Sequence, residues 1–594
     1  MITTVIATSV FLVLQAGTSS IDGIVLNTIT TKPISGAQVI ATRIATPPPP
    51  GVQVPSAIVG VVGGGVIATG GRQVTAIGPN GVPGQPAQIP PARTDSNGRF
   101  SFRDLEPGTY FLRASGEGYA QQEYNARPGG ANGMSTQVTL SAGQAVKDVV
   151  FRMVPGGTVS GRVSGSTGEP LVNIEVSLLR SIYDPEGRKT FQQSGMATTN
   201  DRGEYRLFWI TPGRYYLSAT SSNRPIPGAP FNPAAIRNKY PRTFYPTMTD
   251  IGTATPIEVQ PAIEISGLDF RLDEQPTYSV RGRVIDPSSG QPPRNTSVSI
   301  TLRDSVVNTG FFSSGSIYNP SDGTFEFRDV APGSYLVRAQ LPLNGRFEPG
   351  QPPPAPPTAT APVDVAGDVD GVVLTLVPSA SIFGRVRLEG EPLPQQAQGF
   401  RPTVNLRPAV LGGIGGPPPR PSQTNPDGSF NIDGVVPGDY RVTANWGFGS
   451  SQMNLYVKEI RLGSTDVLNN AMVVTGPTSE LLEVVFGKDA GQVSGTVRAD
   501  SQQLMASAQV VLVPTQREQH DRYKFEITNK NGQFNFLSVP PGSYKIFAWE
   551  DIERFSWFDS AVLARYEAEA MPVTVNASSN VTLDLKVIHA LGTH

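Results

Sequence analysis

The sequence predicts an all-β protein, a tandem array of five small β-sandwich modules with one short helix in the last. One passage recurs five times along the 594 residues. The 63 glycines and 55 prolines fall largely at fixed places between alternating apolar runs, which is typical of short strands joined by tight turns. A chain of this length is too long for a single hydrophobic core, so several modules are expected.

The recurring passage reads TDSNGRFSFRDLEPGTYFLRA in its first copy. Each copy has a glycine after a polar turn and, ten residues later, the glycine of a Pro-Gly pair. An aromatic residue lies two positions after the first glycine, and a tyrosine lies two positions after the second. The glycine pairs are Gly98 and Gly108, Gly203 and Gly213, Gly323 and Gly333, Gly428 and Gly438, and Gly532 and Gly542. Successive Pro-Gly glycines are 105, 120, 105 and 104 residues apart, a normal domain size.

This passage predicts a β-hairpin. Asn or Asp before the first glycine tolerates positive φ, as a tight turn requires. The alternation of Phe100 with Phe102 turns one face of the first strand inward. Pro followed by Gly predicts a type II turn before the second strand. The constant spacing is expected because a slip of one residue would turn the buried face outward.

Further strands flank the hairpin. A Gly-x-Val strand precedes it in every copy, beginning at Gly23, Gly161, Gly282, Gly384 and Gly495. A second strand follows, clearest in the first copy (from Ile34) and the fifth (from Ala506). Another alternating pair lies downstream of the hairpin. Six or seven short strands per module, without a long helical pattern, predict a β-sandwich.

The order G-x-V, then T-D-x-x-G-x-F-x-F, then L-x-P-G-x-Y resembles the carboxypeptidase regulatory-like domain. The resemblance covers nearly the whole chain and implies a Greek-key, prealbumin-like (transthyretin-like) sandwich of about seven strands. It also implies a bacterial exported protein, because many bacterial copies of this domain stand in such proteins without a peptidase.

The predicted domains follow the repeat. They are a signal peptide at 1–17 and modules at 18–155, 156–276, 277–379, 380–489 and 490–590. Module 1 carries a Pro/Gly-rich insertion at 46–92, which reads as an extended loop. Module 2 has an aromatic, basic excursion from Arg224 to Asp250. In module 5, Phe558, Val562, Leu563 and Tyr566 predict one short helix. Both the excursion and this helical segment could cap a sandwich end or line a binding surface.

The first residues predict export. An apolar run from Val5 to Leu14, followed by Ala16 and Gly17, has signal-peptide length, although no Lys or Arg precedes it. A first β-strand is the alternative for this segment. No other segment has about 18 consecutive apolar residues, so no membrane span is expected. The expected location is secreted, periplasmic or at the bacterial cell surface.

Composition argues against several functions. The formal net charge of −2 gives no broad electrostatic surface for nucleic acid. The chain has no cysteine, which excludes disulfides and thiolate metal sites. The glycine-rich stretches lack the Gly-Lys-Ser/Thr ending of a phosphate loop, and Asp95 to Gly98 lacks the oxygen ligands of a calcium loop. No cofactor or metal is therefore expected.

No catalytic set is visible either. The three histidines are His520, His589 and His594. No H-E-x-x-H or H-x-x-E occurs, so the peptidase activity in the family name is not expected here. A serine triad would have to use His520, and no nucleophile elbow accompanies it. The chain is predicted not to be an enzyme, with no catalytic, metal or cofactor-binding residues and with its ligand-binding residues unknown.

Two functions remain from the sequence. The first is a non-catalytic structural spacer, or an interaction or adhesion scaffold, at the cell envelope, with another envelope protein as partner. The alternative is carbohydrate binding, with a polysaccharide partner. That alternative rests on Trp446, Trp549 and Trp557, which follow hairpin strands near a module edge. Trp209 lies inside the second hairpin and is expected in the core. The oligomeric state is not predicted.

Overall fold

The computed structural model describes residues 19–44, 89–124, 137–221, 240–294, 296–303, 307–308, 316–341, 356–391, 401–409, 419–446 and 454–589. The predicted signal peptide, most of the 46–92 insertion and His594 lie outside these residues. The chain divides into two compact units. One comprises Met1–Arg162, Glu204–Tyr215 and Pro256–Leu268, and the other comprises the rest.

The described residues form ten sheets, which come in five pairs along the chain and confirm the all-β sandwich class. Module 1 contains β1 (Ser19–Asn27), β2 (Gln38–Ile44), β3 (Ala92–Arg93), β4 (Arg99–Leu105), β5 (Gly108–Ser115), β6 (Gln122–Glu123), β7 (Val138–Leu140) and β8 (Ala145–Met153). Module 2 contains β9 (Gly157–Ser164), β10 (Ile174–Tyr183), β11 (Lys189–Thr198), β12 (Glu204–Ile210), β13 (Gly213–Ser221), β14 (Thr243–Phe244), β15 (Ile257–Val259), β16 (Glu264–Ile265) and β17 (Phe270–Arg271).

Modules 3 to 5 repeat this order. Module 3 contains β18 (Tyr278–Ile285), β19 (Ser297–Leu302), β21 (Ile317–Tyr318), β22 (Thr324–Val330), β23 (Gly333–Gln340), β24 (Thr358–Val365) and β25 (Val369–Thr375). The short strand β20 (Val307–Asn308), between β19 and β21 in the chain, pairs with β11 and extends a sheet of module 2. Module 4 contains β26 (Ala380–Leu388), β27 (Thr403–Pro408), β28 (Ser422–Gln423), β29 (Ser429–Val435), β30 (Gly438–Asn445), β31 (Tyr456–Leu462), β32 (Thr465–Asp466), β33 (Met472–Val474) and β34 (Leu482–Gly487). Module 5 contains β35 (Gly491–Arg498), β36 (Gln509–Pro514), β37 (Lys524–Ile527), β38 (Gln533–Val539), β39 (Gly542–Trp549), β40 (Met571–Val575) and β41 (Asn580–Lys586).

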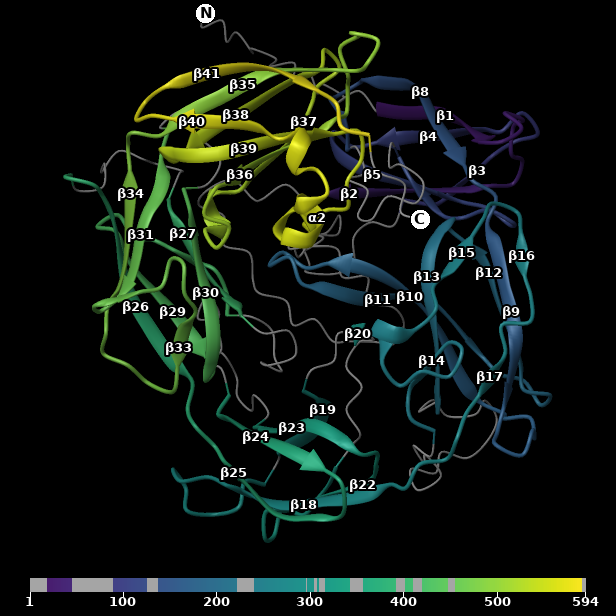
Figure 1. The fold of residues 1–594 in the computed structure, drawn as a ribbon, viewed down its shortest axis with the longest axis vertical. Helices are drawn as coiled ribbons and strands as arrows, with labels where there is room; N and C mark the ends of the chain where they lie inside the picture. The colour runs from purple at the N-terminus through teal and green to yellow at the C-terminus, as the bar shows by residue number, and fades with distance from the viewer. Residues whose placement is uncertain are drawn as a thin grey trace, which may run out of the picture. The chain divides into compact units, whose positions relative to one another are not determined.

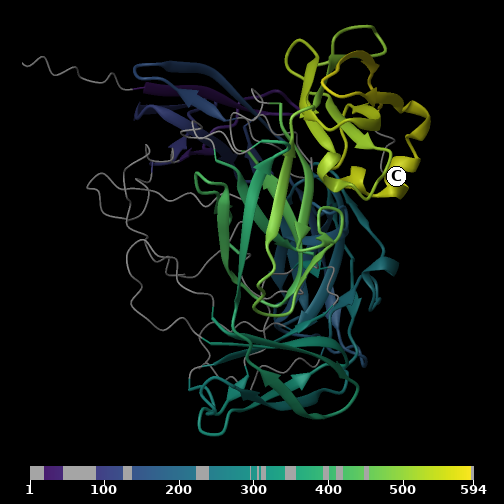
Figure 2. The same cartoon turned by 90° about the vertical axis from the view of Figure 1, so that its left-hand side faces the viewer.

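One strand order recurs in the two sheets. In module 5, the first sheet places β35 between β38 and β41, and the second places β36 and β39 between β37 and β40. The prediction that the recurring passage forms a β-hairpin is therefore wrong: β38 pairs with β35 and β39 pairs with β36, so its two strands do not pair with each other but lie in opposite sheets and connect the two layers (Figure 1). Figure 2 gives the turned view, in which the teal strands of module 3 again form two layers.

The glycine of the Gly-x-Val strand lies against a buried aromatic ring. In module 3, a Cβ on Gly282 would lie 2.6 Å from the Phe325 ring and even closer to the backbone oxygen of Val372 on the last strand. Real Cβ atoms essentially never approach so closely, so only glycine fits. The same kinds of neighbour, an aromatic ring and a backbone carbonyl from near the module's end, meet Gly23, Gly161, Gly384 and Gly495. At Gly161 this carbonyl is that of Leu268, between β16 and β17. The recurring glycine and the recurring aromatic residue are therefore two halves of one contact.

The recurring tyrosine stabilises the connection between the two strands of the recurring passage. Its ring is in the core, and its hydroxyl donates a hydrogen bond to the carbonyl oxygen four residues earlier, just before the second strand. The bonds are Tyr110 to Glu106 (2.6 Å), Tyr215 to Thr211 (2.8 Å), Tyr335 to Ala331 (3.0 Å), Tyr440 to Val436 (2.8 Å) and Tyr544 to Pro540 (2.6 Å). This arrangement is a tyrosine corner, which satisfies a backbone acceptor where the chain crosses between sheets.

The predicted type II turn at Pro-Gly is wrong. The glycine φ is +157° at Gly108, +152° at Gly213, +154° at Gly333 and +155° at Gly438, far from the value near +80° that this turn needs. The reason is that this glycine is already the first residue of the strand that follows, as in β5, β13, β23, β30 and β39. Gly438, for example, pairs with Val474.

A β-bulge interrupts the first strand of the recurring passage in every module. Six residues after the first glycine, one residue adopts a left-handed conformation: Asp104, Trp209, Asp329, Gly434 and Ser538, with φ between +54° and +76°. The pairing register shifts at this point, for example between Leu207 and Ile210 in module 2. A bulge moves the next side chain to the other face. Trp209 is therefore exposed and Ile210 buried, so the prediction that Trp209 lies in the core is wrong.

The strand that follows the Gly-x-Val strand is present in all five modules, although the sequence showed it clearly in only two. In β10, all residues from Ile174 to Leu179 are buried. A strand covered on both faces has no alternating apolar pattern, which is why β10 could not be recognised from the sequence. Phe244 and Ile251, from the described part of the module 2 excursion, pack with Leu179 and Phe191 on one face.

The predicted helix exists but is short. Helix α2 covers Ser560–Ala564, and Asp559 caps it by accepting a hydrogen bond from the Ala561 N–H (2.8 Å). Leu563 and Tyr566 are buried as predicted, in a second cluster with Trp549 and Trp557. The cluster includes Val511 and Val513 of β36, whose alternate residues belong to the main core. The segment therefore covers the outer face of a sheet rather than a sandwich end.

The glycine contact gives a stability prediction. Gly282→Ala forces a methyl group onto the Phe325 ring, and we expect it to destabilise module 3 by about 1–3 kcal/mol or more, the usual cost of overpacking. The matched control is Gly367→Ala in the same module, because a Cβ there meets nothing within 4 Å. Hydrogen exchange of peptides from β18 and β22 measures the effect locally. Equal exchange in the two variants would contradict the contact.

Candidate binding surface

His520 does not form a triad. Its ring is half-buried and stacks on Phe558, with centroids 4.8 Å apart and an interplanar angle of 7°. Tyr523 packs on it as well, at 6.0 Å. Burial lowers the pKa of His520. The histidine that would have to serve as a general base is thus packed in an aromatic cluster.

His589 joins two carboxylates at one end of module 5. Its Nδ1 lies 3.1 Å from Glu550 Oε2, and its Nε2 lies 3.0 Å from Asp500 Oδ2. Lys586 Nζ also pairs with Asp500, at 2.9 Å. Hydrogen bonds to Glu550 and Asp500 raise the pKa of His589. In the described ranges, no group of three or more His, Cys, Asp or Glu side chains could hold a metal ion.

The three tryptophans singled out for sugar binding are buried. Trp446 packs edge-on against Phe486 (5.2 Å), Trp549 stacks on Phe547 (4.9 Å), and Trp557 stacks on Phe525 (4.9 Å). All three are at most 3% exposed. Carbohydrate binding therefore loses the residues on which the sequence based it. Trp209 is 46% exposed, the reverse of its predicted position.

The Asp/Asn loops act as turns. Asp95 Oδ1 accepts hydrogen bonds from the backbone N–H groups of Asn97 (2.9 Å) and Arg99 (2.8 Å). Asn529 does the same in module 5, with Asn531 and Gln533. The side-chain oxygens that a cation would need are thus directed at the backbone, as in an Asx turn.

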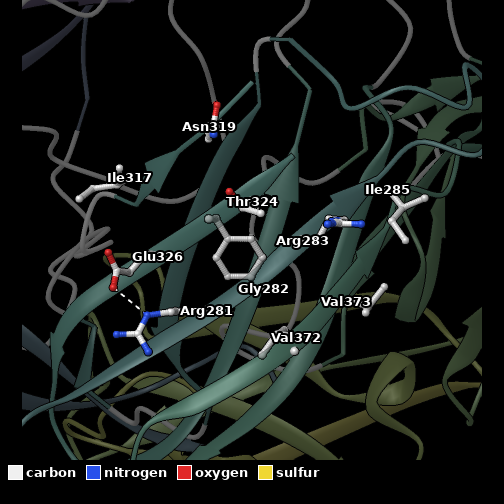
Figure 3. Close-up of a pocket in the computed structure, with 12 residues that line it drawn as sticks. Arg281, Gly282, Arg283, Ile285, Ile317, Asn319, Thr324, Glu326, Val372 and Val373 are labelled. Carbon is white, nitrogen blue, oxygen red and sulfur yellow. Dashed lines mark hydrogen bonds and ion pairs between the residues drawn. The ribbon is translucent and has the colours of Figure 1, made fainter. Parts of the chain in front are cut away.

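An open groove of about 650 Å³ lies on the outer face of the first sheet of module 3. Gly371 leaves it open, because it adds no side chain. Exposed Ile285, Ile317 and Val373 line it together with Arg283 and Thr324. Figure 3 shows Ile285 and Val373 at one end of this groove and Arg281 with Glu326 at the other.

Ion pairs occupy the charged end of the groove. Arg281 Nε lies 2.8 Å from Glu326 Oε1, and Arg281 Nη1 lies 3.3 Å from Asp370 Oδ1. Arg328 Nη2 approaches Glu326 at 2.7 Å. Hydrogen bonds from Arg328 and Arg281 lower the pKa of Glu326. The groove is open and lined by both apolar and charged side chains, which suits surface recognition better than enclosure of a small molecule.

Residues 71–154 match the family model of the carboxypeptidase regulatory-like domain. The match covers less than half of the chain, so it shows that this part is similar to that family. The four later modules repeat the glycine, the aromatic residue and the tyrosine of this regulatory-like domain in the same strand order. A comparison with curated proteins gave no match.

Several solved structures are similar to the chain at low identity. The Bacillus anthracis TIE protein is 10% identical over 72% of this chain and 73% of that chain, with a TM-score of 0.14. GBS52, the minor pilin of Streptococcus agalactiae, is 14% identical over 44% and 97%, with a TM-score of 0.21. BcpA, the major pilin subunit of Bacillus cereus, is 11% identical over 72% and 98%, with a TM-score of 0.13. These scores are too low for function or assembly to be carried over.

The His589 cluster gives a pH prediction. The pKa of His589 is raised in the folded protein, so the stabilisation is complete below the unfolded pKa of about 6.5 and is lost as pH rises through the folded pKa. We expect exchange protection of β41 peptides, corrected for the intrinsic rate, to fall from about pH 5 to about pH 8. His589→Gln keeps a polar side chain without titration and should remove this dependence. The same pH dependence in both proteins would contradict the role of His589.

Proposed function

We propose that the chain is a non-catalytic, exported scaffold whose modules act as tension-bearing spacers at the bacterial cell envelope. One observation carries the proposal. In every module, the first strand pairs in parallel with a strand near the end of the same module. Because the two strands run in the same direction, the chain enters a module at one end and leaves it at the other. Each module thus adds its own length to the chain.

Parallel neighbours also determine how tension acts. In module 3, Val280 pairs with Val369 at one end of the two strands, and Ile285 pairs with Thr375 at the other. A pull on the two chain ends of the module therefore slides β18 along β25 and loads all of their hydrogen bonds together. A pull applied to neighbouring residues at the same end would break the bonds one after another.

Some support for this role lies in the module 1–2 junction, within one compact unit. The Ala120 N–H bonds to the Val154 oxygen, and the Gly156 N–H bonds to the Gly118 oxygen, both at 3.0 Å. Tyr119 and Pro155 also form a bridge. A short connection held by backbone hydrogen bonds transmits force better than a flexible linker.

The proposal predicts a direction-dependent unfolding force for module 3. The natural chain has no cysteine, so two introduced cysteines define the points of attachment. Thr277→Cys with Thr375→Cys pulls β18 and β25 in shear. Ile285→Cys with Thr375→Cys peels them from one end. We expect a severalfold higher unfolding force for the first pair in single-molecule pulling. Equal forces would overturn the tension-bearing role.

Export is tested separately. We expect fractionation of the native bacterium to place the protein in the envelope or the medium, with a mature N-terminus close to Ala16 and Gly17. N-terminal sequencing of the fractionated protein measures this directly. A cytosolic protein that retains Met1 would overturn the export part of the proposal and leave the pulling result unaffected.

A further inference from the structure

Trp209 occupies a position that disfavours it. Its φ is +57°, in the left-handed region, where a bulky side chain is strained. The other four modules place Asp104, Asp329, Gly434 and Ser538 there, which are small or tolerate this conformation better. Burial of the side chain offsets the cost of this backbone strain only partly, because 46% of Trp209 is exposed. A strained side chain that the core does not need points to a role at the surface.

Trp209 stands in an exposed aromatic surface. Phe208 beside it is 58% exposed, and the two rings lie 5.0 Å apart at 78°. Gly156 leaves room for this arrangement, because a Cβ there would lie closer than 3.0 Å to the Trp209 backbone. Two aromatic side chains thus reach solvent from the bulge of β12, where the other modules have none.

The sheet face beside these rings is polar but carries balanced charge. Arg206 Nη2 pairs with Glu264 Oε2 (3.1 Å), and Ser160 Oγ donates a hydrogen bond to the same carboxylate (3.3 Å). Arg162 pairs with Glu204 at 3.3 Å. The charges of these two arginines and two glutamates sum to zero. The face therefore offers N–H donors and carboxylate acceptors without attracting a strongly charged ligand.

We propose that this face, defined by Ser160, Arg206, Phe208, Trp209 and Glu264, binds a neutral polysaccharide. Sugar rings would stack their apolar C–H faces on Trp209 and Phe208, and their hydroxyl groups would hydrogen-bond with Arg206 and Glu264. An exposed sheet face suits an extended chain of sugars better than a small enclosed ligand. The proposal rests on the scaffold role only in that the scaffold would present this surface.

The test uses the full chain and four neutral probes: xylan, glucomannan, mixed-linkage β-glucan and starch. Affinity electrophoresis measures binding, and iodide quenching reports on Trp209, since the other three tryptophans are buried. We expect at least one probe to retard the protein and to protect Trp209 from iodide. Retardation by none of these four would overturn the proposal.

Two variants separate binding from a structural role. Trp209→Gly places the module 4 residue at the bulge, so we expect binding to fall at least tenfold while the unfolding temperature of the protein stays equal or rises. Trp209→Phe keeps a ring and should retain affinity within a few fold. Unchanged binding by Trp209→Gly would overturn the proposed role of Trp209 in binding, and a lower unfolding temperature would instead assign it a structural role. Neither outcome changes the pulling or export results, so a failure here is distinct from a failure of the scaffold.

Discussion

The contact between a glycine, an aromatic ring and a carbonyl oxygen sets the geometry of each module. The glycine lies on the first strand of the module, and the ring lies on the first strand of the recurring passage. The oxygen comes from near the module's end, as with Gly384, Phe430 and Leu482. Three strands that are far apart in sequence thus meet at one point of the first sheet. Since a Cβ does not fit there, the ring can lie against the backbone and fill the core beneath.

The bulge and the tyrosine corner follow from the same constraint. The first strand of the recurring passage must place its aromatic ring beneath the first sheet, and the chain must then cross to the second sheet within ten residues. The left-handed residue, such as Asp329, turns the strand, and the tyrosine, here Tyr335, satisfies the carbonyl that the turn leaves without a ladder partner. This explains why the spacing between the two glycines is constant while the loops between other strands differ.

The sequence was sufficient for the two strands of the recurring passage and for the sandwich class, because turn glycines and inward aromatic residues have strong local signatures. The predicted hairpin pairing was wrong, because each of these strands pairs with a strand outside the passage, as β4 does with β1 and β5 with β2. It failed where tertiary structure changes the pattern. Continued alternation from Tyr205 and Leu207 places Trp209 inside, but the bulge shifts the inward position to Ile210. Trp549 was expected near an edge, yet the segment around α2 covers it. The surface of module 2 was missed for the same reason, since no local pattern distinguishes a bulge from a continuing strand.

Inner and outer faces of these modules are under different constraints. The inner contacts recur in all five modules, because any change in ring, glycine or tyrosine disturbs the core. The outer faces differ: module 3 has an apolar and charged groove, module 5 has an aromatic cluster under α2, and module 2 exposes Phe208 and Trp209. A repeated core with variable outer faces would let a module carry a binding surface without any change to the inner contacts. Trp209 is the exception to this separation, because its strained backbone belongs to the bulge that recurs in all five modules, whereas its exposed ring belongs to an outer face found only in module 2.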